Sequence, residues 1–292
     1  MNYALDALWW RLKNPVVRDL AVLLTAPVPW HSSAELPVAI LLGNHGFRQL
    51  LDLDDHPQPL LDFLHNHPFK QHRLGLYAEQ LLSFWFQTAA HIQFIQNNLT
   101  ITNNKQTVGS IDFLIKINHV PYHIELTCKY FGAAQADVNA FVGLNPQDKL
   151  INKVVKLEQQ LALSNHPAAI SQLQQLGIDI HHLQRASIVR GMLFLKENQP
   201  ALLAPINRLS WQGYWLDDWA QIPATLNIHP DSRFWLHHRL SLLAPAKIDE
   251  RDSLSLQQAK SINQGILAVL ERREDGYWHE IQRIMKIDNH KN

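Results

Sequence analysis

The sequence predicts an α/β protein in which helices flank one mixed sheet. Apolar residues make up 46% and charged residues 18% of the 292 residues, proportions that are typical of a folded globular chain. Three runs rich in β-branched and aromatic residues follow one another between 91 and 131, and a fourth spans 186–195. Helical patterns precede these runs and lie between the third and the fourth. This order of elements predicts an α/β layout around a single sheet.

Composition and charge exclude several classes of protein. Lys and Arg total 26, as do Asp and Glu, so the chain as a whole has no basic field for nucleic acid. The single cysteine, Cys128, excludes a disulfide framework and a zinc site built from cysteines. No apolar run is long enough to cross a membrane, and residues 1–6 lack the basic region of a secretory signal. We therefore expect a cytoplasmic protein with no membrane partner.

The predicted chain has three parts. Residues 1–70 read as a helical N-terminal extension with proline-rich loops, and residues 71–197 carry the core. Residues 198–292 form a tryptophan-rich α+β extension packed on that core. Within this extension the patterns predict a strand at 233–240 and two helices within 255–286.

The core elements follow in order. Residues 73–90 are apolar on almost every side, a pattern typical of a buried helix. The strand-like runs 91–101, 108–117 and 120–131 are separated by short polar turns, which predicts an antiparallel meander.

A second core helix is predicted to begin at Asn145. Asparagine suits the N-cap position and the following Pro146 suits the first helical position. Leu150, Val154 and Leu157 then form an apolar stripe at helical spacing. The run 186–195 closes the core as a further strand.

Two carboxylates and a lysine lie on the predicted hairpin. Asp112 is in the second strand, whereas Glu125 and Lys129 are in the third and share a face because four residues separate them. Two carboxylates on adjacent strands repel each other unless they share a cation or a proton. Mg²⁺ prefers such hard oxygen ligands, and a nearby lysine can stabilise developing negative charge.

Two helices add further candidate residues. Glu79 lies on an apolar helix face, where a carboxylate needs a cationic partner. Lys149, Lys153, Lys156 and Gln160 follow helical spacing beside the apolar stripe of the later helix, and this polar edge could contact phosphates. The alternative interpretation is that the lysines form a solvent-exposed helix face that binds no ligand.

The arrangement resembles the PD-(D/E)XK nuclease superfamily, which has a restriction-endonuclease-like fold. The stretches at 109–115, 123–131, 143–157 and 190–195 also resemble a bacterial family of unknown function, domain-of-unknown-function family 1853. The superfamily resemblance implies a PD-(D/E)XK-like mixed sheet flanked by helices and a Mg²⁺ or Mn²⁺ site for phosphodiester hydrolysis. It also implies metal binding by Asp112 and Glu125, assistance by Glu79 through metal or water, and support of the nucleophile by Lys129.

The resemblance implies nucleic acid as partner, DNA before RNA, with backbone contacts from Lys149, Lys153 and Lys156. The sequence departs from the superfamily pattern, because Thr127 stands where the lysine is usual and Lys129 comes two residues later. One alternative is therefore a catalytically degenerate nuclease fold that binds nucleic acid or protein. Another is a hairpin held by a simple ion pair between Lys129 and one of the acids. The sequence leaves the oligomeric state open.

Overall fold

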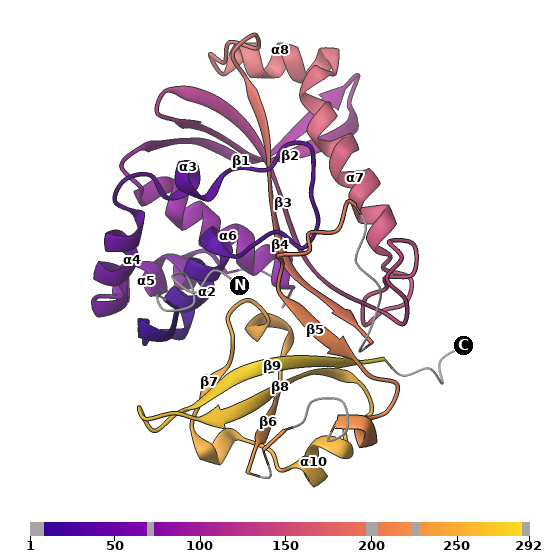
Figure 1. Ribbon diagram of the computed structural model, residues 1–292. Helices are drawn as coiled ribbons and strands as arrows, with labels where there is room; N and C mark the ends of the chain where they lie inside the picture. The colour runs from indigo at the N-terminus through magenta and orange to yellow at the C-terminus, as the bar shows by residue number, and fades with distance from the viewer. Residues whose placement is uncertain (1–8, 69–72, 197–203, 223–227, 230, 288–292) are drawn as a thin grey trace. The chain divides into compact units, whose positions relative to one another are not determined.

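The computed structural model describes residues 9–68, 73–196, 204–222, 228–229 and 231–287 (Figure 1). The chain divides into two compact units. We call the segments 2–128 and 153–190 the first unit, and the segments 129–152 and 191–292 the second unit. Both mix helices and strands, so the predicted α/β class with a mixed sheet flanked by helices is confirmed. Among the described residues, no helix is long and apolar enough to cross a membrane.

The first unit opens with a group of helices that pack around α2 and α6. Asn14 caps α2 by accepting from two backbone amides of the first turn, and Pro15 occupies the first helical position. At the other end the buried Arg190 donates to the carbonyl oxygens of Leu23 and Leu24 at 2.6 and 3.3 Å. These bonds satisfy carbonyls that the helix itself leaves without a partner. The helices are α2 (Pro15–Thr25), α3 (Val38–Leu42), α4 (Gly46–Asp55), α5 (Gln58–Asn66) and α6 (Leu74–Thr88).

Three long strands then form the predicted antiparallel meander, β1 (Ile92–Asn103), β2 (Gln106–Ile117) and β3 (Val120–Ala133). Both turns have two consecutive residues with positive φ, Asn104 and Lys105 in one and Asn118 and His119 in the other. This backbone conformation matches the twist of paired strands and produces tight hairpins.

Helices α7 (Leu150–Ala162) and α8 (Pro167–Gln175) connect β3 to β4 (Gln184–Leu195). In the first unit the strand order is β1-β2-β3-β4. Helix α8 packs against β1, where Ala169 and Leu173 are buried with Leu99 and Ile111 of the sheet. The predicted strand at 186–195 is therefore confirmed, two residues longer at its start.

The second unit continues from the ends of β3 and β4 and adds the order β4-β5-β9-β8-β6, with β7 on β9. Strands β5 and β9 extend the sheet in parallel, whereas β8 pairs antiparallel with β9 and with β6. The added strands are β5 (Gln212–Trp215), β6 (Arg233–Leu236), β7 (Lys247–Ile248), β8 (Gly265–Arg272) and β9 (Trp278–Lys286), and the helix is α10 (Leu256–Lys260).

The close approach of β3 and β4 within the second unit requires a glycine. Gly191 has a φ of +133°, which residues with a side chain rarely adopt. A Cβ atom built on it would lie 1.7 Å from the carbonyl oxygen of Lys129. No other residue fits this position without separating the two strands.

Two predicted helical segments are wrong in their bounds or type. Helix α7 begins at Leu150, because Asn145 instead closes a turn in which its carbonyl accepts from the amide of Asp148. The two helices predicted within 255–286 are the short α10 followed by the β8–β9 hairpin. Short apolar runs such as 265–270 suit a buried strand and a buried helix equally, and pairing with other strands decides between them.

Two tryptophans of the C-terminal segment belong to the core. Trp215 and Trp219 are 8% and 1% exposed, and the indole of Trp219 donates to the carbonyl of Ile262 at 2.7 Å. A base stacked on a tryptophan needs an open ring face, which these two burials exclude.

Two residues of β9, Glu280 and Arg283, form a buried ion pair in the second unit. The Arg283 guanidinium donates to both carboxylate oxygens of Glu280, at 2.7 and 3.0 Å, and to the carbonyls of Leu242 and Ala244. Burial opposes ionisation of Glu280, but the charge of Arg283 outweighs it and holds the pKa of Glu280 below its usual range. Both groups are therefore charged at neutral pH and depend on each other.

Candidate functional site

The strand registers of the first unit bring three polar side chains into one row. The pairs on either side of Asn98 in β1 place it beside Asp112 in β2. The register of β2 with β3, continued by one residue, places Asp112 beside Glu125. The sheet therefore presents an amide and two carboxylates at directly neighbouring positions.

The two strand carboxylates are held by several hydrogen bonds. Glu125 is completely buried, with one oxygen 2.7 Å from Nε2 of His123 and the other accepting from Nε2 of Gln160 at 2.5 Å. Asp112 accepts from the backbone amide of Leu126 at 2.9 Å. A hydrogen bond between the side chains of Asp112 and Glu125 joins the pair. The network fixes both carboxylates in place from β3 and α7.

Glu79 is the third carboxylate of this group. Burial and then the charge of Asp112 raise its pKa to about 7, although a hydrogen bond from Asn98 lowers it. One turn further along α6, the buried Ser83 meets the side-chain amide of Asn97 at 3.5 Å. The face of α6 that carries Glu79 therefore lies against β1 at the row of polar residues.

Negative charge is crowded in this group. Burial, followed by the charge of Glu125, raises the pKa of Asp112 to about 7. Burial also raises the pKa of Glu125 to about 7, with Glu79 adding to the shift and Lys156 opposing it. Three carboxyl groups that titrate near neutral pH are typical of a site that binds a cation or exchanges protons. We call Glu79, Asp112 and Glu125 the carboxylate cluster.

Helix α7 supplies the cation closest to the cluster. Gln160 contacts Glu125 directly, and Lys156 lies one turn earlier on the same helix face, where its charge stabilises the Glu125 carboxylate. Lys156 is exposed and has no ion-pair partner among the described residues. Its ammonium group is therefore available to a ligand at the cluster.

Lys129 has a different environment. Its Nζ donates to Asp148 at 2.6 Å, and both residues belong to the second unit. One alternative expected an ion pair between Lys129 and either Asp112 or Glu125. In the structure, Lys129 instead forms its ion pair with Asp148. The role that the superfamily resemblance gives Lys129 stays a prediction.

The lysine stripe is divided by the fold. Lys149 precedes α7, in a bridge with Val142, and belongs to the second unit. Lys153 and Lys156 lie on α7 in the first unit, four and seven residues after Lys149, and Lys156 is exposed. Phosphate contacts by the three lysines stay a prediction.

Two residues of the site escaped the sequence analysis. His123 was detectable, because it stands two residues before Glu125 and must share its strand face. Asn98 was not, because its position beside Asp112 depends on the register of β1. Its φ of 48° inside a strand is uncommon for a residue other than glycine, and such conformations occur often at functional sites.

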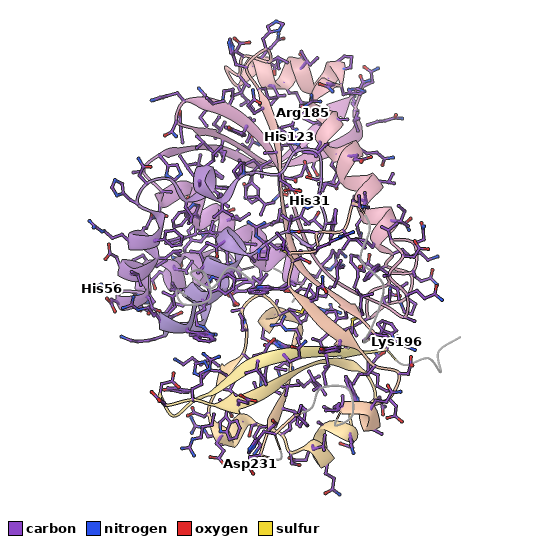
Figure 2. All side chains as sticks on the ribbon, viewed as in Figure 1. His31, His56, His123, Arg185, Lys196 and Asp231 are labelled. Atoms are coloured by element: carbon purple, nitrogen blue, oxygen red, sulfur yellow. The ribbon has the colours of Figure 1, made fainter. Side chains whose placement is uncertain are left out.

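His123 is a neutral, buried residue at the edge of the cluster. Burial lowers its pKa to about 4, with the charge of Arg185 adding to the effect and Asp112 opposing it. Its Nδ1 atom has no hydrogen-bond partner among the described residues. Arg185, at the start of β4, is exposed close by (Figure 2). The imidazole therefore contacts Glu125 and lies within electrostatic range of a second positive charge.

The donor chemistry of the cluster suits a hard divalent cation on two carboxylates. No group of three or more His, Cys, Asp or Glu side chains in the described ranges is placed to hold one metal ion. Mg²⁺ needs one or two carboxylates and completes its shell with water and phosphate oxygens. The adjacent Asp112 and Glu125 supply such a pair, and a cation would offset the burial that is the main cause of their raised pKa values. The assignment of all three acids as metal ligands stays a prediction.

Comparison with known proteins gives one result. The model of a family described as "Domain of unknown function (DUF1853)" matches residues 7–287, which is nearly the whole chain. No curated protein and no solved structure matches. The match confirms the family resemblance that the stretches between 109 and 195 predicted.

Proposed function

The chain belongs to the DUF1853 family, a domain of unknown function, and for it we propose a metal-dependent phosphodiesterase activity on nucleic acid, DNA before RNA. One observation carries the proposal. Two directly neighbouring carboxylates and a third nearby all titrate near neutral pH, beside an exposed lysine and a glutamine of one helix. Structural ion pairs normally keep the pKa of a carboxylate below its usual value, whereas functional sites often combine burial with neighbouring like charges, which raise it.

The order of elements supports the PD-(D/E)XK-like part of the proposal. A helix carries Glu79, two adjacent strands carry Asp112 and Glu125, and the following helix carries Gln160. This is the order in which the superfamily places its corresponding residues.

Each residue of the site then has a role in hydrolysis. A bound Mg²⁺ or Mn²⁺ would neutralise the carboxylates and polarise a phosphate oxygen. Asp112 and Glu125 would hold the ion, while His123 and Gln160 orient Glu125 through its two oxygens. Glu79, with a pKa near 7, can take the proton of an attacking water at neutral pH.

We assign the stabilising cation of the reaction to Lys156. It lies on the helix face that contacts Glu125, whereas Lys129 is paired with Asp148. Lys156 would stabilise the negative charge that develops on the phosphate. Lys129 remains the candidate that the superfamily pattern favours, so a comparison of the two lysines tests both assignments.

The test is cleavage of labelled single-stranded and double-stranded DNA, and of RNA, with Mn²⁺ or Mg²⁺. We expect Lys156→Ala to slow single-turnover cleavage by about 10- to 100-fold, because one charge at the reacting phosphate is lost. Lys129→Ala should change the rate less than about threefold. Asp112→Asn serves as the inactive control, since it preserves the shape of the side chain. Equal effects of the two lysine variants would contradict the assignment, and no cleavage by the wild type would refute the activity.

A second function is favoured by the closed network around Glu125. Because one oxygen of Glu125 lies 2.7 Å from Nε2 of His123 and the other accepts from Nε2 of Gln160, the site could be a rigid scaffold that binds nucleic acid without cleaving it. The same experiment separates the two functions. Binding without cleavage by the wild type, retained in Asp112→Asn, would establish the binding role.

The predicted lysine contacts can be tested by salt dependence. If Lys149, Lys153 and Lys156 contact the nucleic-acid backbone, each should contribute about 0.7–0.9 to the slope of log affinity against log salt. Changing all three to Ala should therefore flatten the slope by about two units. Fluorescence anisotropy with labelled DNA measures this. Lys260→Ala, at the exposed end of α10, is the control and should leave the slope unchanged. An unaltered slope in the triple variant would make the stripe a solvated face.

A further inference from the structure

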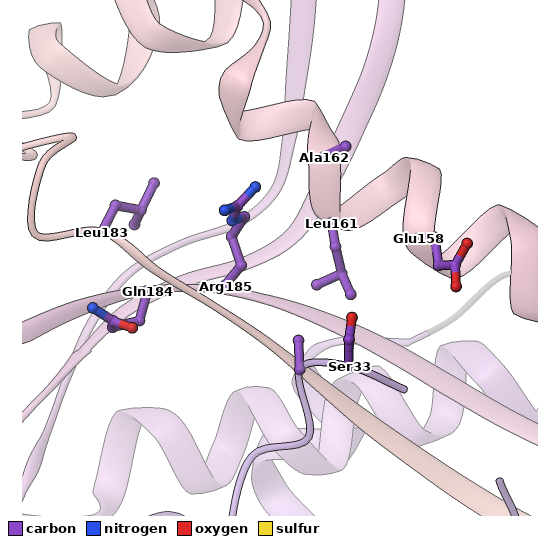
Figure 3. Close-up of a pocket in the computed structure, with 8 residues that line it drawn as sticks. Ser33, Glu158, Leu161, Ala162, Leu183, Gln184 and Arg185 are labelled. Carbon is purple, nitrogen blue, oxygen red and sulfur yellow. The ribbon is translucent and has the colours of Figure 1, made fainter. Parts of the chain in front are cut away.

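A cavity of about 390 Å³ lies in the first unit between the end of α7, the start of β4 and the loop at 33–34. Its walls are two leucines, two alanines, a serine, a glutamine and two charged side chains (Figure 3). This volume is in the range of small-molecule sites, which combine apolar walls with a few polar groups. Six of the lining residues are Ser33, Glu158, Leu161, Ala162, Leu183 and Arg185.

The cavity adjoins the carboxylate cluster through α7 and β4. Gln160 donates to Glu125 on one side of the helix, and the next residue, Leu161, lines the cavity. Arg185 of the cavity wall acts electrostatically on His123, which itself contacts Glu125. The cavity therefore lies beside the residues proposed to act on the phosphodiester.

The loop that forms one wall is held firmly. The amide of Ser187 donates to the carbonyl of Ala34 at 2.6 Å, and the amide of Leu36 donates back to Ser187 at 3.0 Å. The hydroxyls of Ser32 and Ser187 are 2.6 Å apart. Because the loop pairs with β4 in this way, the cavity is preformed and not a gap between mobile segments.

Opposite charges occupy two ends of the cavity. The guanidinium of Arg185 and the carboxylate of Glu158 lie on opposite sides of Leu161 (Figure 3). Both residues are exposed, and within the described part of the chain neither forms an ion pair or a side-chain hydrogen bond. A ligand with an anionic group at one end and a hydrogen-bond donor at the other would satisfy both.

We infer that the cavity is a subsite for one nucleotide, next to the phosphodiester that the carboxylate cluster attacks. The phosphate binds Arg185, the base packs against Leu161 and Leu183, and an exocyclic amino group of the base donates to Glu158. Arginine recognises phosphate through paired, charge-assisted hydrogen bonds, and the leucines bury the flat face of the base. The inference rests on the proposed function, because it identifies the cavity's ligand as part of a nucleic acid.

The experiment measures binding of free nucleotides to the full chain without metal, by isothermal calorimetry. The probes are dCMP, whose base has an exocyclic amino group, dTMP, which lacks one, and inorganic phosphate. We expect dCMP to bind about tenfold or more tightly than phosphate and more tightly than dTMP. Arg185→Ala should weaken both nucleotides about tenfold or more, whereas Glu158→Ala should remove the preference for dCMP over dTMP.

Two further variants make the test specific. Ala162→Trp should fill the cavity and abolish nucleotide binding, although residue 162 is exposed and its change should leave the melting temperature nearly unaltered. Arg48→Ala, at an exposed arginine of α4, is the matched control and should bind dCMP like the wild type. Equal binding by wild type, Arg185→Ala and Ala162→Trp would overturn the subsite.

The outcomes also separate the subsite from the proposed function. DNA cleavage by a wild type that binds neither nucleotide would overturn the subsite and leave the activity in place. Nucleotide binding that depends on Arg185 and Ala162, in a protein that cleaves nothing, would support the subsite and refute the activity. Binding of phosphate alone, as tightly as dCMP, would also overturn the inference.

Discussion

At about pH 8 without divalent metal, Asp112→Asn is expected to melt about 5 °C or more above the wild type. Burial and the charge of Glu125 raise the pKa of Asp112 to about 7, so the folded chain must hold a crowded carboxylate above that pH. A carboxyl group whose pKa is higher in the folded state loses stabilising free energy as the pH rises from its unfolded pKa towards 7. Asparagine removes the charge and keeps an oxygen for the amide of Leu126. The gain should be about 2–4 kcal/mol in unfolding free energy.

The pH dependence identifies the cause. At about pH 4, Asp112 is protonated in the folded wild type, so the difference between the two proteins should shrink to nearly zero. Differential scanning calorimetry across this range measures it. Asp52→Asn, at an exposed position of α4, is the control and should show no such trend. A constant difference at all pH values would mean that charge crowding is not the reason.

The same pair of proteins tests the cation. Mn²⁺ that binds only the folded state should raise the melting temperature of the wild type, by an amount set by its concentration relative to the dissociation constant. Asp112→Asn should gain little, because one of the two neighbouring carboxylates has lost its charge. Equal metal-induced shifts in both proteins would show that the carboxylate cluster is not the metal site.

Arg283→Met is expected to cost about 3–5 kcal/mol of unfolding free energy at neutral pH. The substitution leaves the Glu280 carboxylate buried without the guanidinium that contacts both of its oxygens. It also removes donors from the carbonyls of Leu242 and Ala244. Urea denaturation monitored by tryptophan fluorescence measures the loss.

Two comparisons show whether the unpaired charge is responsible. The double variant with Glu280→Gln should recover much of the loss, because the buried charge that Arg283 balances is gone. Lowering the pH below about 4.5 should also reduce the deficit, since the buried carboxyl group that has lost the guanidinium is then protonated. Arg272→Met, at the exposed end of β8, should change stability by less than about 0.5 kcal/mol. A double variant as unstable as the single one would attribute the loss to packing instead.

Local pattern was sufficient for much of the first unit. The apolar run at 73–90 predicts α6, and the alternation of turns with β-branched runs predicts β1, β2 and β3, because these signals act over a few residues. The polar turns at 103–106 and 118–119 were predictable for the same reason. The proximity of Asp112 to Glu125 followed from the hairpin, since a tight turn fixes which residues face each other.

Longer-range pairing decided the rest. The sequence pattern of the β8–β9 hairpin predicts helices. The segment forms strands because β8 pairs with β6 and β9 pairs with β5, contacts that a local pattern does not show. Lys129 lies at a position of β3 that alternates in phase with Glu125. Its ion-pair partner is nevertheless Asp148, which lies in a turn that the sequence pattern predicts to be helical.

By itself, then, the sequence determined the residues that the carboxylate cluster contains and the strands that carry two of them. Only the tertiary structure placed Asn98 beside Asp112, Gln160 and Lys156 beside Glu125, and Arg185 near His123. The physical reason is that spacing along one strand or helix fixes a side chain's direction, whereas contact between elements depends on register and packing. Burial in the folded chain raises the three carboxyl pKa values, while Asn98 and Lys156 oppose the rise at Glu79 and Glu125.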